Sequence, residues 1–326
     1  MFDLSNLMIP AILFFGLGFL ARIIKSDLRF PPDLAKALSI YLLIAIGLHG
    51  GVELAEATLG SALSAVGAAL ALGFGLPLLA YAILVMLGRI DRLNASAIAA
   101  HYGSVSAGTF LTAIAFLQSL GVPYESYPVI MLAIMESPAI IVGLVLAKLS
   151  RRVEPGAEAA GNGETRELLR EALTNGSVLL LLGGMFIGYA AQPEALASIK
   201  PFYTEIFMGA LSLFLLEMGM EAARRIGAFR KVGLFLTGFG IVMPLIGGAV
   251  GLALGHWVLG FSVGGTTLVA VLGASASYIA VPPAMRLAIP EANPSYYLTL
   301  ALGITFPFNV LFGIPLYYYL ARLLGA

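Results

Sequence analysis

The sequence predicts an all-α polytopic membrane protein with ten transmembrane helices, and three observations carry this prediction. Hydrophobic residues make up 60% of the 326-residue chain and charged residues only 11%, whereas a soluble domain carries about 25% charged residues. Apolar runs long enough to cross a bilayer follow one another from end to end. All but two of the 18 basic residues fall on one side of a ten-span arrangement, as expected when basic loops stay in the cytoplasm.

The first span does not resemble a cleavable signal, because MFDLSN carries an acidic residue and no basic ones. Charged or turn residues separate it from nine further apolar runs. The predicted spans lie near residues 7–20, 34–50, 61–88, 93–120, 127–149, 176–192, 202–220, 232–258, 261–288 and 293–323. Glycine, serine or proline interrupts the fourth and the ninth span in the middle.

The distribution of basic residues predicts the orientation. Only Lys200 and Arg322 fall on the side opposite to the others, which predicts that both termini face outside and that a linker at residues 151–175 is cytoplasmic. This linker is polar and rich in glycine and alanine, and residues 165–173 within it are predicted to form a short charged helix. We interpret the linker as a hinge between two halves rather than as a dedicated regulatory segment.

The linker divides the chain into two five-helix repeats, residues 1–150 and 176–326. Because each repeat has an odd number of spans, the second enters the membrane from the opposite side, which is the inverted topology of secondary transporters. Three pairs of patterns recur in the same order in both halves, and the small-residue pair predicts close helix packing. The pairs are Gly67, Ala71 and Gly75 with Gly247, Gly251 and Gly255; GLHGG (47–51) with EMGME (217–221); and GSVSAG (103–108) with GASAS (273–277).

The composition excludes several functional classes. The net charge is zero, cysteine is absent and the three histidines are scattered, so there is no signal for polyanion binding, thiolate chemistry or a transition-metal site. No phosphate-binding loop, dinucleotide fingerprint or hydrolase elbow is present in the sequence. The sequence therefore predicts a protein that is not an enzyme, that holds no organic cofactor and that does not bind nucleic acid.

The two interrupted spans form the predicted substrate site. A helix broken within the bilayer leaves backbone groups unpaired, which is tolerated only in protein or beside a water-filled cavity. Half-helix N-termini favour an anion, and freed carbonyls and hydroxyls suit sodium. Packing around a kink at Pro282 and Pro283 is the alternative, but the matching positions of the two breaks favour a function. The predicted anion-binding residues are Gly103, Ser104, Val105, Ser106, Ser275, Ala276 and Ser277.

Two carboxylates lie inside apolar runs, where an ionisable group is costly unless it is paired or functional. Glu136 is the stronger candidate for a cation site, and the alternative is a protonated, hydrogen-bonded carboxyl. Glu217 lies nearer a helix end, so an interfacial position or a pair with an arginine is an equal alternative to a function. We interpret His101 as a hydrogen-bonded structural residue and Asn309 as a weaker polar candidate.

Five stretches resemble the sodium-dependent bicarbonate transporter family, known best from cyanobacteria. They are residues 217–232, 260–277 and 282–297, with GSVSAGT (103–109) and ESPAIIVG (136–143). The resemblance implies two inverted five-helix repeats, a core domain that moves against a gate domain, and a homotrimer in the bacterial inner (plasma) membrane. It also implies sodium-coupled bicarbonate uptake at the two breaks and a PII-like regulator on the cytoplasmic face.

The chain departs from this family at Tyr278, which stands where the family has an aspartate. A phenol is a weaker sodium ligand than a carboxylate, so we assign the negative charge of the sodium site to Glu136. The predicted sodium ligands are Ser106, Thr109, Glu136, Ser277 and Tyr278, with sodium as the coupling ion.

The leading hypothesis is a sodium-coupled symporter that imports bicarbonate by alternating access. Tyr278 prompts the alternative of a transporter of the same fold for another small carboxylate or metabolite. A ligand-binding membrane receptor without transport is disfavoured because the linker is short and featureless. A passive channel is disfavoured because paired breaks in inverted repeats are typical of alternating access.

Overall fold

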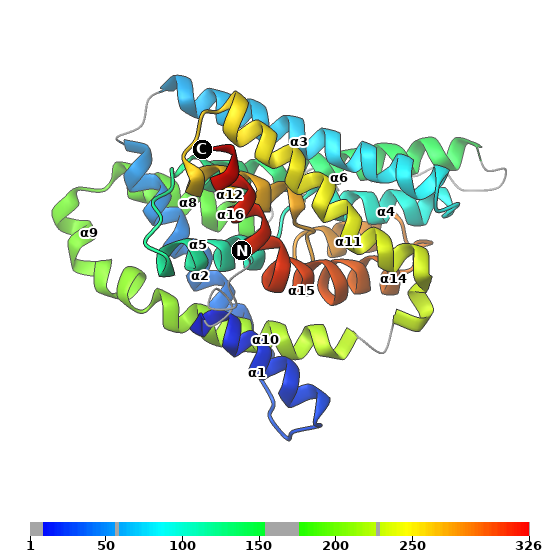
Figure 1. Ribbon diagram of the computed structural model, residues 1–326, viewed down its shortest axis with the longest axis horizontal. Coiled ribbons are helices and arrows are strands. Elements are labelled where there is room, and N and C mark those ends of the chain that lie inside the picture. The colour runs from blue at the N-terminus through cyan, green and yellow to red at the C-terminus, as the bar shows by residue number, and fades with distance from the viewer. Residues whose placement is uncertain (1–8, 56–58, 154–175, 226–228, 326) are drawn as a thin grey trace.

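The computed structural model describes residues 9–55, 59–153, 176–225 and 229–325, and the regular secondary structure in these ranges is all helical (Figure 1). The helix predicted at residues 165–173, like most of the predicted linker, lies outside the described residues.

Helices follow one another through both halves of the chain. In the first half they are α1 (Pro10–Ile23), α2 (Pro32–Ala55), α3 (Leu59–Met86), α4 (Arg92–Gly103), α5 (Ala107–Ser119) and α6 (Tyr127–Val153). In the second half they are α8 (Gly176–Ala190), α9 (Pro193–Lys200), α10 (Phe207–Arg225), α11 (Phe229–Ala253), α12 (Val263–Ala274), α13 (Val281–Ala288), α14 (Pro294–Leu298), α15 (Phe306–Phe308) and α16 (Ile314–Leu324). The π-helical segments η2 (Pro201–Glu205), η4 (Leu254–Val258), η5 (Thr299–Thr305) and η6 (Asn309–Gly313) link or extend them.

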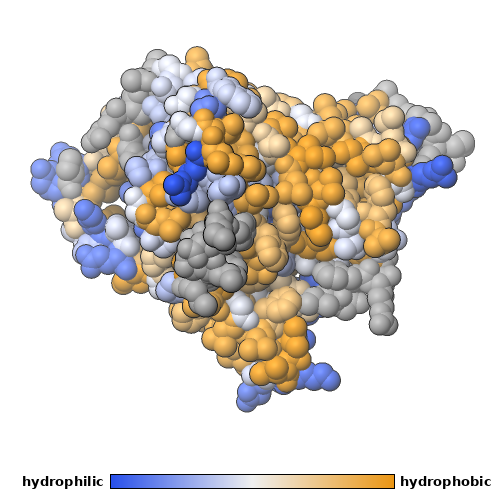
Figure 2. Space-filling model, in the orientation of Figure 1, coloured by the Kyte–Doolittle hydropathy of each residue, from blue (hydrophilic) through white to orange (hydrophobic). Residues whose placement is uncertain are grey.

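Six helical segments of the described chain are long and apolar enough to cross a membrane. They are Pro32–Val52, Gly60–Met86, Tyr127–Arg151, Glu194–Arg225, Val232–Val258 and Pro294–Leu324. Figure 2 shows apolar side chains spread over α3, α11 and α1, with hydrophilic residues at the two ends of the view, near the C-terminus and at the tip of α1. The polytopic, all-helical membrane character is confirmed. The number of ten spans and the inverted topology stay predictions.

The helices pack in two groups. In the first, α1 lies along α10 and α2 lies along α8. In the second, α3, α4 and α6 pack on one another, as do α11, α12 and α16. Contacts of α12 with α5 and α6 join the two halves inside this second group. The interrupted helices therefore lie among the other helices rather than at the edge of the molecule.

Both predicted interruptions occur, with bounds that differ from the sequence patterns. The first is shorter than GSVSAG, because α4 extends to Gly103 and α5 already begins at Ala107. The second extends beyond GASAS, to residue 280. Pro282 and Pro283, expected in the second break, lie instead in the first turn of α13, where a missing backbone N–H costs no helical hydrogen bond.

The prediction that both small-residue patterns permit close packing is right for one half and wrong for the other. In α11, a Cβ atom added at Gly251 would lie 2.5 Å from the Val269 carbonyl oxygen of α12, and one added at Gly247 would collide even more closely with the Gly273 carbonyl oxygen. In α3, a Cβ added at Gly67 or Gly75 would meet nothing within 4 Å. Both helices have the glycine spacing, but only in α11 does the face that carries the glycines pack against a neighbouring helix of the described chain.

Candidate functional site

The first break ends in a well-formed helix start. Ser106 is extended, with φ −108° and ψ 107°, and its side chain caps α5 by accepting a hydrogen bond from the Thr109 amide at 3.1 Å. The Thr109 hydroxyl donates to the same oxygen at 2.9 Å. An α-helix cannot pair its first amides internally, so those of Ala107 and Gly108 have no partner within α5, and the Tyr278 hydroxyl lies against Gly108. The dipole of α5 adds partial positive charge there.

The second break has a different local structure. The Ser275 hydroxyl donates to the Leu272 carbonyl at 3.0 Å and so closes the end of α12. The residue before α13 is Ala280, which provides no side-chain cap. Because Pro282 and Pro283 lack an N–H, the start of α13 offers few amide donors. This break therefore presents mainly hydroxyls and backbone carbonyls.

The two breaks bond directly to each other. The Ser106 amide donates to the Ser275 hydroxyl oxygen at 3.1 Å, and the Ser277 amide donates to the His101 carbonyl at 2.8 Å. These bonds pair backbone groups that each interrupted helix leaves unpaired, so each break helps to stabilise the other. Segments about half a chain apart thereby form one unit, as the site prediction requires.

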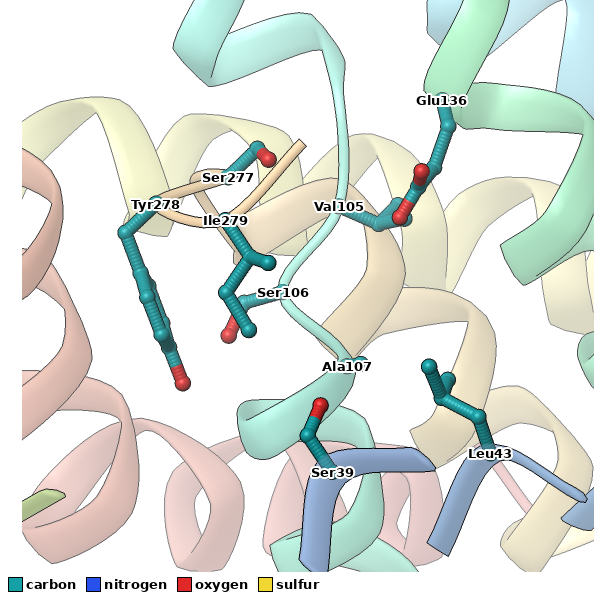
Figure 3. A pocket seen from close by; sticks show the side chains of 9 residues that line it. All are labelled: Ser39, Leu43, Val105, Ser106, Ala107, Glu136, Ser277, Tyr278 and Ile279. Carbon is teal, nitrogen blue, oxygen red and sulfur yellow. The ribbon is translucent and has the colours of Figure 1, made fainter. Parts of the chain in front are cut away.

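A pocket lies against this junction (Figure 3). Its cavity volume is about 10 Å³, which is about the space of one water molecule. An anion with four non-hydrogen atoms would therefore fit only if the walls of the pocket moved apart. The lining residues are Ser39, Leu43, Val105, Ser106, Ala107, Glu136, Ser277, Tyr278 and Ile279.

The predicted site residues divide into three sets. Those that line the pocket are Val105, Ser106, Glu136, Ser277 and Tyr278. Thr109 and Ser275 do not line it but are hydrogen-bonded to Ser106, which does. Gly103, Ser104 and Ala276 are buried away from it. Gly103 is needed for packing, because an added Cβ would collide with the ring of Pro77 in α3.

Glu136 has the environment expected of an intramembrane functional group. Glu136 is only 8% exposed to solvent, and its Oε2 atom has no hydrogen-bond partner in the described part of the chain. Figure 3 shows its carboxyl group pointing toward Val105 of the first break. The helix that carries it, α6, continues through Pro138, so the side chain is presented from a regular helix.

Ser39 and Leu43 of α2 are lining residues that the sequence analysis missed. They lie in an apolar run with no glycine or proline signal, and Ser39 is the polar group that α2 contributes to the pocket. Figure 3 shows the Ser39 hydroxyl directed toward Ala107. The pocket is thus bounded by both groups of helices.

Two weaker candidates have structural positions. The Asn309 amide nitrogen donates to the Ala274 carbonyl at 2.8 Å, which holds the end of α12 just before the second break. The His101 Nδ1 atom lies 2.7 Å from the Ala97 carbonyl, so it carries the proton, and the ring stacks on Tyr297. The Nδ1 hydrogen bond agrees with a structural role for His101, while its Nε2 atom is buried without a hydrogen-bond partner among the described residues.

Glu217 is not paired with an arginine in the described structure. The neighbouring Arg224 and Arg225 both bind Glu221, at 2.7 and 3.0 Å. The Glu217 Oε2 atom is buried and has no hydrogen-bond partner among the described residues, and Glu217 does not line the pocket.

Comparison with known families agrees with this architecture. A family model described as the Na+-dependent bicarbonate transporter superfamily matches residues 10–322, which is nearly the whole chain. The protein therefore belongs to this superfamily and is a membrane transporter rather than an enzyme. No curated protein matches the chain.

Proposed function

We propose that the protein is a sodium-coupled symporter that imports bicarbonate by alternating access. One observation carries the proposal beyond family membership. The two breaks are hydrogen-bonded to each other beside a pocket that also contains the buried carboxyl group of Glu136. Such a pocket combines donors for a small anion with oxygen ligands for a cation.

The anion binds at the start of α5. Ser106 and Ala107 both line the pocket, and the first amides of α5 have no partner within the helix. The Ser106 oxygen already accepts two hydrogen bonds from Thr109, so its own proton is available to an anion. Bicarbonate, which is small, planar and rich in acceptors, suits this set of donors.

The sodium ion binds at Glu136. Hard cations prefer oxygen ligands, and a full negative charge offsets the loss of hydration. Ser277 and Tyr278 line the same pocket, and their hydroxyls would complete the ligand set, together with carbonyls of the second break, once they turn toward Glu136. In this arrangement Thr109 acts through Ser106 rather than as a direct ligand.

The packing supports two inverted five-helix repeats. In two such repeats α1 corresponds to α8, and α2 corresponds to α10. The contact between α1 and α10 then has its counterpart in the contact between α8 and α2. In the same way, the packing among α3, α4 and α6 has its counterpart in that among α11, α12 and α16. We propose that α1, α2, α8 and α10 form the gate and that the other helices form the moving core.

Orientation, membrane and assembly follow the sequence prediction. We propose a homotrimer in the bacterial inner membrane with both termini outside and the 151–175 linker available to a PII-like cytoplasmic regulator. Because the chain lacks cysteine, single cysteines test the topology directly. An impermeant thiol reagent should label a cysteine at Glu194 only from outside and one at Asp27 only from the cytoplasm, and the reverse pattern would refute the orientation.

Tyr278 favours a second candidate function. A phenol in the pocket could stack on or hydrogen-bond a larger carboxylate, so transport of another small carboxylate by the same cycle is the alternative.

Uptake of labelled bicarbonate into proteoliposomes separates the two candidates. An inward sodium gradient should stimulate uptake by the wild-type protein, and liposomes containing Ser106→Leu protein provide the matched background. If sodium stimulates uptake of a carboxylate such as acetate or pyruvate and no bicarbonate is taken up, the substrate is that carboxylate rather than bicarbonate.

A further inference from the structure

The fixed charge of the pocket comes from a single side chain. Of the nine lining residues, Glu136 is the one carboxylic acid, and none is lysine, arginine or histidine. Its Oε2 atom is buried without a hydrogen-bond partner in the part of the chain that the structure describes. When Glu136 is ionised, the pocket walls therefore provide no positive side chain to balance it.

The groups suited to an anion lie in the same small pocket. Ser106 and Ala107, at the start of α5, line it together with Glu136, and α5 is a regular helix of 13 residues. An anion at the α5 N-terminus would thus lie within a few ångströms of the carboxylate. Two negative charges about 5 Å apart, at an effective dielectric constant of about 20, repel strongly enough to weaken anion binding roughly 100-fold.

This conflict has a direct solution in the order of binding. Resting on the function proposed above, we infer that a sodium ion binds first at Glu136 and that the anion then binds beside it at the start of α5. The ion cancels the repulsion, so the anion binds much more tightly to the sodium-loaded protein. Coupling then arises within one pocket, and anion uptake without sodium is suppressed.

Thermodynamic linkage makes the inference quantitative. If sodium raises the affinity for bicarbonate by a given factor, bicarbonate must raise the affinity for sodium by the same factor. Both factors should depend on the charge of Glu136. Glu136→Gln keeps the shape of the side chain but removes the charge, so this variant should bind bicarbonate without needing sodium.

The experiment measures equilibrium binding of labelled bicarbonate to purified protein at fixed pH and ionic strength, with choline replacing sodium. In the wild-type protein, saturating sodium should lower the Kd for bicarbonate roughly 100-fold. In Glu136→Gln the Kd should change less than about twofold over the same range and stay near the sodium-saturated wild-type value. Glu217→Gln is the matched control, since it removes a membrane carboxyl outside the pocket, and it should keep the wild-type sodium dependence.

Two results would overturn the inference. One is a wild-type Kd for bicarbonate that does not change with the sodium concentration, whether or not it changes with pH. The other is a Glu136→Gln protein that keeps the full sodium dependence. Labelled sodium binding to the wild-type protein, with and without bicarbonate, provides the reciprocal measurement without any variant. Wild-type protein that binds sodium but no bicarbonate would instead refute the proposed substrate, which distinguishes the two failures.

Discussion

The two breaks occupy corresponding places in the two halves, yet they differ in the groups that they present. The first consists of Ser104, Val105 and Ser106 and leads into a helix capped by a serine hydroxyl. The second covers residues 275–280 and leads into an eight-residue helix with two prolines in its first turn, where Ala280 provides no cap and the Ser277 hydroxyl accepts from the Val281 amide at 3.5 Å. One break therefore offers amide donors, and the other offers hydroxyls and carbonyls.

This difference indicates a division of labour. Amide donors at a helix start suit an anion, whereas carbonyl and hydroxyl oxygens suit a cation. Two chemically identical breaks would compete for the same ligand, whereas two different ones can hold a cation and an anion side by side. The correspondence between the halves thus concerns the fold, and we propose that the departures from it decide which ion each break contributes to binding.

The largest expected effect is at the first break. Ser106→Leu should lower bicarbonate uptake by at least about 100-fold, because a leucine fills a cavity the size of one water and displaces the anion donors. Loss of the N-cap costs about 1 kcal/mol and overpacking a buried site adds about 1–3 kcal/mol, so the thermal unfolding temperature should also fall, and uptake is compared at a temperature at which the variant stays folded. Uptake and unfolding are measured on the same preparation. If the variant takes up bicarbonate at the wild-type rate, the anion does not bind at the first break.

Ser39 provides a test of the wall outside the two breaks. Ser39→Leu should reduce uptake roughly 10-fold by narrowing the pocket from the α2 side. Ser64→Leu, an exposed serine on α3, is the control and should leave uptake unchanged. If both variants transport at the wild-type rate, α2 does not bound the substrate site.

Asn309→Ala should weaken the second break without touching the first. The change leaves the Ala274 carbonyl at the end of α12 unpaired and opens a space beside Tyr317, whose hydroxyl also contacts Asn309 at 3.3 Å. Leaving a buried acceptor unpaired costs about 1–3 kcal/mol, so the unfolding temperature should fall. The sodium concentration for half-maximal uptake should rise by a larger factor than the bicarbonate concentration for half-maximal uptake. A larger rise for bicarbonate than for sodium would contradict the assignment of the cation to the second break.

The smallest expected effect is at the loop between α13 and α14. The Arg151 guanidinium donates to Glu291 at 2.8 and 3.1 Å and also to the Ala288 carbonyl. The hydrogen bond from Arg151 lowers the pKa of Glu291 below its ordinary value of 4.5. The folded-state pKa is the lower one, so this stabilisation is present above pH 4.5 and is lost as the pH falls through the folded-state pKa.

Glu291→Gln should therefore destabilise the protein at neutral pH by less than about 1 kcal/mol, because the carboxylate is partly exposed to solvent. The difference in unfolding temperature between variant and wild type should shrink as the pH is lowered through this range. A difference that grows on acidification would show that the ion pair is not its cause.

The sequence predicted the class of the fold and the existence of both breaks because each leaves a local signal. Long apolar runs can only be buried in lipid or protein, and glycine, serine and proline in mid-span mark a broken helix. Glu136 was also predictable, since a lone carboxylate in an apolar run is rarely accidental.

Features that depend on how helices turn toward one another were not predictable in this way. Ser39 gives no local signal, because its role comes from α2 passing the breaks. Two glycines show the same limit. Gly67 belongs to a small-residue pattern but faces open space, and Gly103 belongs to the pattern that predicts the first break but packs against Pro77. The spacing of residues fixes which of them share a helix face, but the partner of that face is set by tertiary packing.

The central claim is that the anion binds at the start of α5, and site-specific protection tests it most directly. Ala107→Cys places a single thiol in the pocket wall of a chain that otherwise has no cysteine. Bicarbonate with sodium should slow its reaction with a small thiol reagent several-fold, whereas chloride with sodium should not. A cysteine at Leu63, on the exposed surface of α3, controls for general effects of the ions. Equal labelling rates at position 107 with and without bicarbonate, in protein that still transports it, would contradict the account.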